Sequence, residues 1–204
     1  MKQYLTQMSH SKYWDYFILV SRFLIGIVFI GYGYGKLTEG QFGISPEELA
    51  TPLQDLSFFR VSWYLFDQQP FKAFIGISQL LCGFLLILNR TAILGAFLFL
   101  PIVTTILIID LSFMPKALAM AFAWRLSFYI LLDILILLHY KDKMLVLWRT
   151  ITQNVTTKFK YPIWVYLLLP LSAIVLEIAG VLPKALVQLI SDPSNFLASL
   201  KTMF

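Results

Sequence analysis

Five polar side chains lie deep inside otherwise apolar stretches of the chain, and their types could support chemistry within a membrane. They are Arg22, Gln79, Arg125, Asp133 and Glu177. A charge at the centre of a membrane span costs about 2.5–3.5 kcal/mol on insertion scales, so each charged residue should face other helices and find a partner. Such residues can fix the order of helices, carry a proton, or hold a polar head group.

The depths of these residues in the membrane predict which of them meet. Counted from the polar flanks on one side, Arg22 lies about 10 Å in and Asp133 about 12 Å in. Arg125 and Glu177 both lie about 24 Å from that side. We therefore predict two ion pairs, Arg22–Asp133 and Arg125–Glu177, with Gln79 between them in depth. The pairs could be structural, or they could form a polar track for a proton or for the head group of a quinone or other amphiphile.

The other reactive residue types are too few for most kinds of catalysis. Cys82 is the only cysteine, so a disulfide or a dithiol relay within the chain is excluded. A haem held by two histidines would need both His10 and His139. The glycines of residues 31–35 have the spacing of a nucleotide loop, but no strand precedes them, so close helix packing is the better interpretation. We expect no catalytic residue and no metal site, and a non-catalytic subunit more than an enzyme.

Apolar runs of membrane-spanning length position these residues. The chain has 204 residues, of which 59% are hydrophobic and 13% charged, whereas about 25% of the residues in soluble domains are charged. Crossing a bilayer needs roughly 20 apolar residues in a helix. Five runs approach that length: Tyr16–Tyr34, Ala73–Leu88, Ala92–Ile109, Ala117–Tyr140 and Ile163–Leu182. Pro101 and Pro170 fall inside two of them and predict kinks.

The architecture follows from how these runs are connected. Only Asn89-Arg90-Thr91 separates the second run from the third, which predicts an antiparallel helical hairpin, and Gly83, Gly95 and Ala96 would let its helices approach closely. Residues 110–116 read as a turn. We predict an all-α membrane protein with a single integral membrane domain over 1–204. A four-helix transmembrane bundle would occupy 16–140, and a basic loop, a fifth span and an amphipathic C-terminal segment would occupy 141–204.

Residues 36–70 form the long connection and carry two local signals. Ser45, Pro46 and Glu48 form a capping signature that predicts a short helix, limited by Pro52. Leu56–Phe66 is rich in aromatic residues and has one arginine, a composition typical of segments at the water–lipid interface. This segment is either a cover lying on the membrane or a lid over a lateral pocket.

Charge distribution predicts orientation and excludes one class of partner. The net charge is +5, but the basic residues lie between apolar runs and form no patch, so a nucleic-acid partner is not expected. The short loops on the side of the N-terminus carry more Lys and Arg than the other side. The positive-inside rule therefore predicts a protein of the cell (inner) membrane with its N-terminus cytoplasmic and its C-terminus extracytoplasmic.

Three stretches of the sequence resemble the DoxX-like family of small polytopic membrane proteins. The first has an arginine and a later G-x-x-K-L motif, the second is the hairpin with Gln79 where the family usually has an acidic residue, and the third closes the four-helix unit. The matching stretches are Arg22–Gly26 with Tyr32–Leu37, Gln79–Leu88 with Arg90–Ala96, and Asp110–Phe113. The family-motif positions are Gly33, Lys36, Arg90, Gly95 and Asp110.

The resemblance, which covers about residues 16–140, implies a four-helix membrane bundle that partners redox enzymes. The family name comes from a subunit associated with a thiosulfate–quinone oxidoreductase. We therefore expect an accessory subunit of a quinone-linked redox complex that binds a quinone-like or lipid amphiphile and docks a partner protein. The alternative is a membrane assembly or cargo factor that grips client proteins and has no redox role. A transporter is disfavoured because the chain is short and lacks inverted repeats.

Overall fold

A computed structural model describes residues 11–193, apart from 39, 44, 154–156 and 158. The chain divides into two compact units, residues 1–151 and 152–204, which we describe separately. The described residues contain helices and no strand. The prediction of an all-α membrane protein is confirmed.

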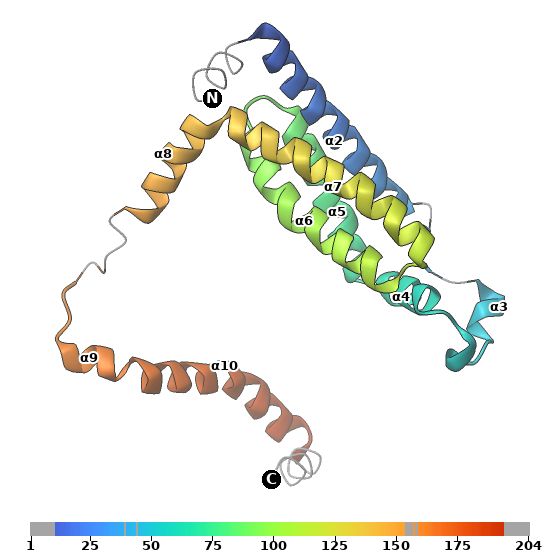
Figure 1. Ribbon diagram of the computed structural model, residues 1–204. Helices are drawn as coiled ribbons and strands as arrows, with labels where there is room; N and C mark the ends of the chain where they lie inside the picture. The colour runs from blue at the N-terminus through green and yellow to red at the C-terminus, as the bar shows by residue number, and fades with distance from the viewer. Residues whose placement is uncertain (1–10, 39, 44, 154–156, 158, 194–204) are drawn as a thin grey trace. The chain divides into compact units, whose positions relative to one another are not determined.

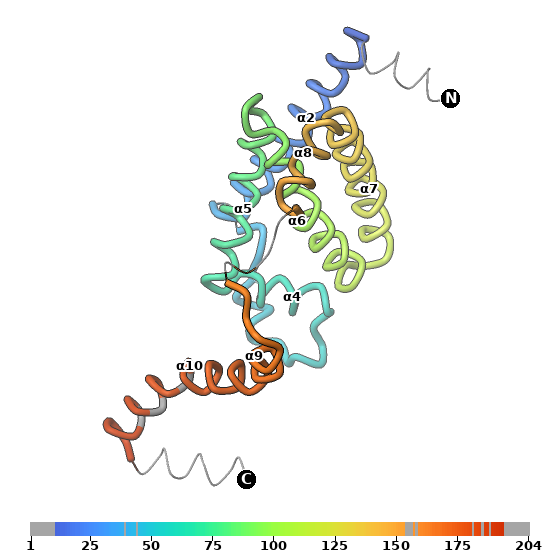
Figure 2. Tube along the Cα trace, turned by 90° about the vertical axis from the view of Figure 1, so that its left-hand side faces the viewer, coloured from blue at the N-terminus to red at the C-terminus, as the bar shows by residue number. Residues whose placement is uncertain are grey.

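Four long helices of the first unit form an up-and-down bundle. They are α2 (Lys12–Thr38), α5 (Phe71–Ile87), α6 (Ala92–Phe113) and α7 (Lys116–His139). Contacts join α2 to α5, α5 to α6, α6 to α7, and α7 back to α2, so the four helices close a ring. Figures 1 and 2 show them side by side. With 27 residues, α2 is about 40 Å long.

The contact between α2 and α5 is a direct approach of two backbones. A Cβ placed on Gly26 would lie 2.9 Å from the carbonyl oxygen of Gly83, and one on Gly83 would lie 2.6 Å from that of Gly26. About two helical turns further along the same contact, a Cβ on Gly33 would lie 2.6 Å from the carbonyl oxygen of Gly76. On each helix the two glycines are seven residues apart, so they share one face. No larger residue fits at these positions without moving a helix.

The hairpin of α5 and α6 is also closely packed, but through a different glycine. A Cβ on Gly95 would lie 2.6 Å from the backbone nitrogen of Leu86. Ala96 is fully buried beside it. The expectation that Gly83 serves this hairpin is wrong, because Gly83 faces α2, and a position within a helix does not by itself show which neighbour it faces.

Most of the interior of the bundle is apolar, and so is most of its outer surface. Phe29 and Phe99 meet at the centre with ring centroids 4.5 Å apart, and both are fully buried. Large apolar side chains on the outward faces are exposed, among them Phe23, Leu81 and Phe128. A bilayer provides the apolar surroundings that such a surface needs.

The loops differ from expectation at two points. Asp110, expected in a turn, lies in the last turns of α6, which continues to Phe113, so the turn consists of Met114 and Pro115. The basic stretch that follows α7 was expected to be a connection, but it begins with helix α8 (Lys141–Thr152). By contrast, the capping signature does start a short helix, α3 (Pro46–Leu49). A 3₁₀ turn (Leu53–Asp55) and helix α4 (Phe58–Phe66) follow it.

The second unit contains helices α9 (Ile163–Leu167) and α10 (Leu169–Ser191). The expected kink near Pro170 is a break between the two helices at Leu168. Helix α10 continues through Pro183, so the predicted boundary after Leu182 is not a helix end. The terminal part of the amphipathic segment, residues 194–204, lies outside the described residues.

Membrane spans can be counted by length and composition. Helices α2, α6, α7 and α10 are each long and apolar enough to cross a bilayer. A fifth span exists if α4 and α5, which meet at 80°, count as one bent segment. The described residues thus contain four or five candidate spans. In α10, no residue of the most apolar stretch is buried by the rest of the protein.

The glycine contact between α2 and α5 can be tested by substitution. We expect Gly83→Leu to lower the thermal unfolding temperature of the protein in detergent more than Leu85→Ala does, because the leucine must push α2 away from α5. The control is Gly31→Leu on α2, where no atom lies within 4 Å of a Cβ. Equal unfolding temperatures for the Gly83 and Gly31 variants would contradict the close approach.

Candidate ligand-binding cavity

A cavity of about 470 Å³ lies at the end of the bundle away from the Asn89–Thr91 turn. All four bundle helices contribute to its wall, together with α4 and the loop that follows α2. Most of the lining is apolar and much of it is aromatic. The aromatic lining residues are Tyr32, Phe42, Trp63, Phe66, Phe71, Phe74 and Phe122. Apolar walls of this kind suit a hydrophobic molecule or tail.

One cation and one anion line this cavity, and both are almost fully buried. Lys36 is 6% exposed and Asp110 is 4% exposed. The ammonium of Lys36 donates a hydrogen bond to Gln41 at 3.3 Å and lies 5.5 Å from the ring centroids of Tyr32 and Phe42. Within the described residues, the two charges form no ion pair at 4.0 Å or less, and the Asp110 carboxylate has no hydrogen-bond partner.

The sequence brings these two residues together through helix packing. Lys36 follows Gly33 by three residues on α2, so the close approach of Gly33 to α5 carries Lys36 to the wall of the cavity. Asp110 reaches the same space from the end of α6. Both are among the positions that the sequence analysis predicted as family-motif residues. Of the other motif positions, Gly33 and Gly95 are packing contacts, and Arg90 is exposed in the hairpin turn.

Helix α4 covers the cavity with aromatic side chains. The ring of Phe66 lies 5.3 Å from that of Phe71 on α5 and 6.2 Å from that of Phe113 on α6. It also lies 5.7 Å from the ring of Phe42 and 6.0 Å from that of Trp63. The aromatic segment predicted for the interface therefore lies directly over a pocket.

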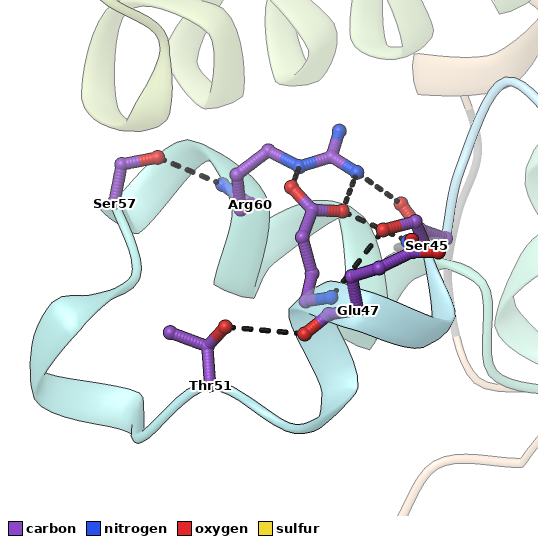
Figure 3. Close-up of polar contacts among 7 residues, drawn as sticks. Ser45, Glu47, Thr51, Ser57 and Arg60 are labelled. Carbon is purple, nitrogen blue, oxygen red and sulfur yellow. Dashed lines mark hydrogen bonds and ion pairs between the residues drawn. The ribbon is translucent and has the colours of Figure 1, made fainter.

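An ion pair holds this cover to the preceding loop, as Figure 3 shows. Arg60 on α4 donates to Glu48 on α3 at 2.6 and 2.5 Å, and to the carbonyl oxygen of Gly43 at 3.4 Å. Glu48 also accepts from the backbone nitrogen of Ser45 and thereby completes the predicted capping box. The Arg60 guanidinium, together with the Ser45 backbone, lowers the pKa of Glu48 to about 2. The pair consequently stays charged at neutral pH.

Gly43 gives the loop its shape at this point. Its φ of +100° is a conformation that side-chain-bearing residues rarely adopt. Its backbone nitrogen donates to the carbonyl oxygen of Trp63 at 2.9 Å. The loop that carries Gln41 and Phe42 into the cavity is therefore hydrogen-bonded directly to the cover.

Arg22 lies at the opposite end of the bundle and does not pair with Asp133. Its guanidinium donates to the carbonyl oxygens of Leu86 and Ile87 at 3.0 and 3.1 Å. It also donates to Asn89 at 3.0 Å and to the hydroxyl of Tyr140 at 3.2 Å. The predicted Arg22–Asp133 ion pair is wrong. Carbonyl groups in the last turn of a helix lack partners within that helix, and Arg22 satisfies those at the end of α5.

Asp133 and Gln79 are fully buried in the bundle, and their polar side-chain atoms have no hydrogen-bond partner among the described residues. Each lies seven residues before a residue that Arg22 contacts: Gln79 before Leu86 on α5, and Asp133 before Tyr140, the residue that directly follows α7. Because α5 and α7 run in the same direction, this equal spacing places Gln79 and Asp133 at similar depth.

The other predicted pair joins residues of separate units. Arg125 is exposed on α7 and donates to the Tyr129 hydroxyl at 2.8 Å. Glu177 lies on α10 in the second unit and is exposed there. The Arg125–Glu177 pair therefore stays a prediction. Among the described residues, no group of three or more His, Cys, Asp or Glu could hold a metal ion.

Sequence reasoning missed most of the cavity. Lys36 and Asp110 were noted only as motif positions, and none of Tyr32, Gln41 and Phe66 was predicted to line a site. The signal that could have found them is the aromatic segment 56–66, whose pocket-covering role was one of two interpretations. A cavity formed by side chains from six segments is otherwise difficult to see in a sequence, because its lining consists of the same residue types as a core.

Comparisons with known proteins agree with the family resemblance. The family model described as DoxX matches residues 17–113, which cover α2 to α6. YwoB of Bacillus subtilis, an uncharacterized protein, is 35% identical over 94 residues. That alignment covers 45% of this chain and 59% of YwoB. No solved structure matches.

The contacts of Arg22 predict how two substitutions combine. We expect Arg22→Ala to lower the unfolding temperature, because it leaves the carbonyls at the end of α5 without their donor. We expect Asp133→Ala to change the free energy of unfolding by the same amount in that background as in the natural protein, so the effects of the two substitutions should add to within about 0.5 kcal/mol. The measurement is a double-mutant cycle of unfolding in detergent. A double variant more stable than the sum of the two single effects predicts would instead support an ion pair.

Proposed function

We propose that this chain, whose residues 17–113 match the DoxX family, is a membrane subunit that binds a quinone-like or lipid amphiphile in the cavity beneath α4. The observation that carries the proposal is the cavity itself. It combines a largely apolar wall with a buried lysine and a buried aspartate. These two parts suit the two parts of an amphiphile, because its tail requires an apolar surface and its head group requires hydrogen-bonding groups.

We further propose that the subunit belongs to a quinone-linked redox complex and docks a partner protein. The support is the family resemblance together with the shortage of catalytic groups in the chain. Helix α10 offers an apolar surface for such docking, because its side chains are exposed within the second unit. An assembly or cargo factor remains the second candidate, and the same exposed helix is the observation that favours it.

The buried polar residues Gln79 and Asp133 fit this proposal as part of a proton path. On the inner face of α7, Tyr129 lies between Asp133 and Leu126, and Leu126 lines the cavity. Intramembrane ionisable residues without structural partners are candidates for such roles. Arg22, by contrast, has a structural role in capping α5, so we exclude it from the path.

The proposed orientation places the cavity on the extracytoplasmic side. Single cysteines at Asp55 and Asp142, in a Cys82→Ser background, should react with a membrane-impermeant maleimide from opposite sides of the membrane. Both positions are exposed, and we expect Asp142 to label only from the cytoplasm. Labelling of both positions from one side would contradict the topology.

The cavity can be tested by blocking it. Ser78 lines the cavity on α5, whereas its neighbour Ile77 is 57% exposed on the outside of the bundle. We expect a quinone or lipid to co-purify in near-stoichiometric amount with the natural protein and with Ile77→Phe, and to be lost from Ser78→Phe because the ring would fill the space. Solvent extraction and mass spectrometry measure this amount. The same amphiphile content in both variants would contradict the proposed site.

A further inference from the structure

The two buried charges in the cavity determine which head groups it can accept. Lys36 and Asp110 are on different helices, and each is more than nine-tenths buried and faces the same space. A buried charge is costly unless it is paired, and these two lie more than 4.0 Å apart. The Lys36 ammonium can donate hydrogen bonds, and the Asp110 carboxylate can accept them.

The charges of this pair sum to zero. A proton passing from Lys36 to Asp110 would leave the sum unchanged, so the conclusion does not depend on where that proton lies. No other charged residue lines the cavity within the described residues. A charged head group would therefore lose its hydration on entering without meeting a net opposite charge. A neutral head group with an oxygen acceptor and a hydroxyl donor could bridge the two side chains.

We propose that the cavity selects amphiphiles with an uncharged, oxygen-bearing head group and excludes fatty acids and alkylamines. The inference rests on the proposed function, because it concerns the ligand of the same site. Quinones, quinols and monoacylglycerols all have such head groups. In each of them a carbonyl or hydroxyl oxygen can accept from Lys36, and in quinols and monoacylglycerols a hydroxyl group can also donate to Asp110. Gln41, which is hydrogen-bonded to Lys36, holds the ammonium in place for this contact.

The test is a competition among four probes in native mass spectrometry of the detergent-purified protein. The probes are monododecanoylglycerol, decylubiquinone, dodecanoate and dodecylammonium, whose masses differ. We expect one or both neutral probes to occupy the protein at least about tenfold more than either charged probe, a difference of about 1.4 kcal/mol. The ratio of the two neutral probes then distinguishes a lipid from a quinone.

Single charge substitutions should reverse this preference in opposite directions. Asp110→Asn leaves Lys36 as the only charge and should favour dodecanoate, whereas Lys36→Met leaves Asp110 and should favour dodecylammonium. The double variant should bind the neutral probes again, and so provides a control if a single variant folds poorly. If the two charges had a structural role only, these variants would differ in unfolding temperature without any change in which probe binds.

Two outcomes separate the two proposals. If dodecanoate binds the natural protein as well as the neutral probes do, head-group selection is overturned, but amphiphile binding stands. If none of the four probes binds, the proposed function fails and the inference fails with it. A Ser78→Phe control, which should lose all four probes, shows that any binding measured is in this cavity and not on the outer surface.

Discussion

The direct approach of α2 to α5 determines where the polar residues of this bundle lie. Gly26 faces Gly83 and Gly33 faces Gly76, so the two backbones touch where side chains would normally separate helices by 8–10 Å between axes, as is typical of packed helices. Arg22 lies one turn before this contact and Lys36 one turn after it. The same glycine contact therefore places Arg22 at the end of α5 and Lys36 in the cavity. A wider separation would withdraw both side chains from their partners.

The two ends of the bundle treat buried polar groups differently. Arg22 makes four hydrogen bonds, to helix carbonyls, Asn89 and Tyr140. That is sufficient to explain a buried arginine as a structural residue. At the other end Lys36 has one hydrogen bond, and Asp110 has none among the described residues. Incompletely satisfied polar groups beside an apolar cavity are typical of ligand sites, whereas fully satisfied ones are typical of structural contacts.

The sequence was sufficient to predict the helices but not the contacts between their side chains. Hydropathy located the four bundle helices to within a few residues, and local capping chemistry located α3, because both signals lie within one segment. The Arg22–Asp133 pair failed for a physical reason. Depth fixes one coordinate of a side chain, whereas the direction in which it points depends on packing, and unpaired carbonyls at the end of α5 offered Arg22 closer partners. Asp110 was assigned to a turn, yet α6 continues past it to Phe113.

Of the polar residues inside the membrane, Asp133 is the one that a structural role explains least well. A buried charge or acid stabilises a fold only through the contacts that compensate for its lost hydration. Arg22 has such contacts, and Arg125 has one, to the hydroxyl of Tyr129. Asp133 has none: it is fully buried, and both carboxylate oxygens lack partners among the described residues. Gln79 shares this condition at similar depth on α5. Packing alone would be served better by apolar residues at both positions, so their presence supports a functional role: the Asp133 carboxyl can carry a proton, and the Gln79 amide can donate and accept hydrogen bonds.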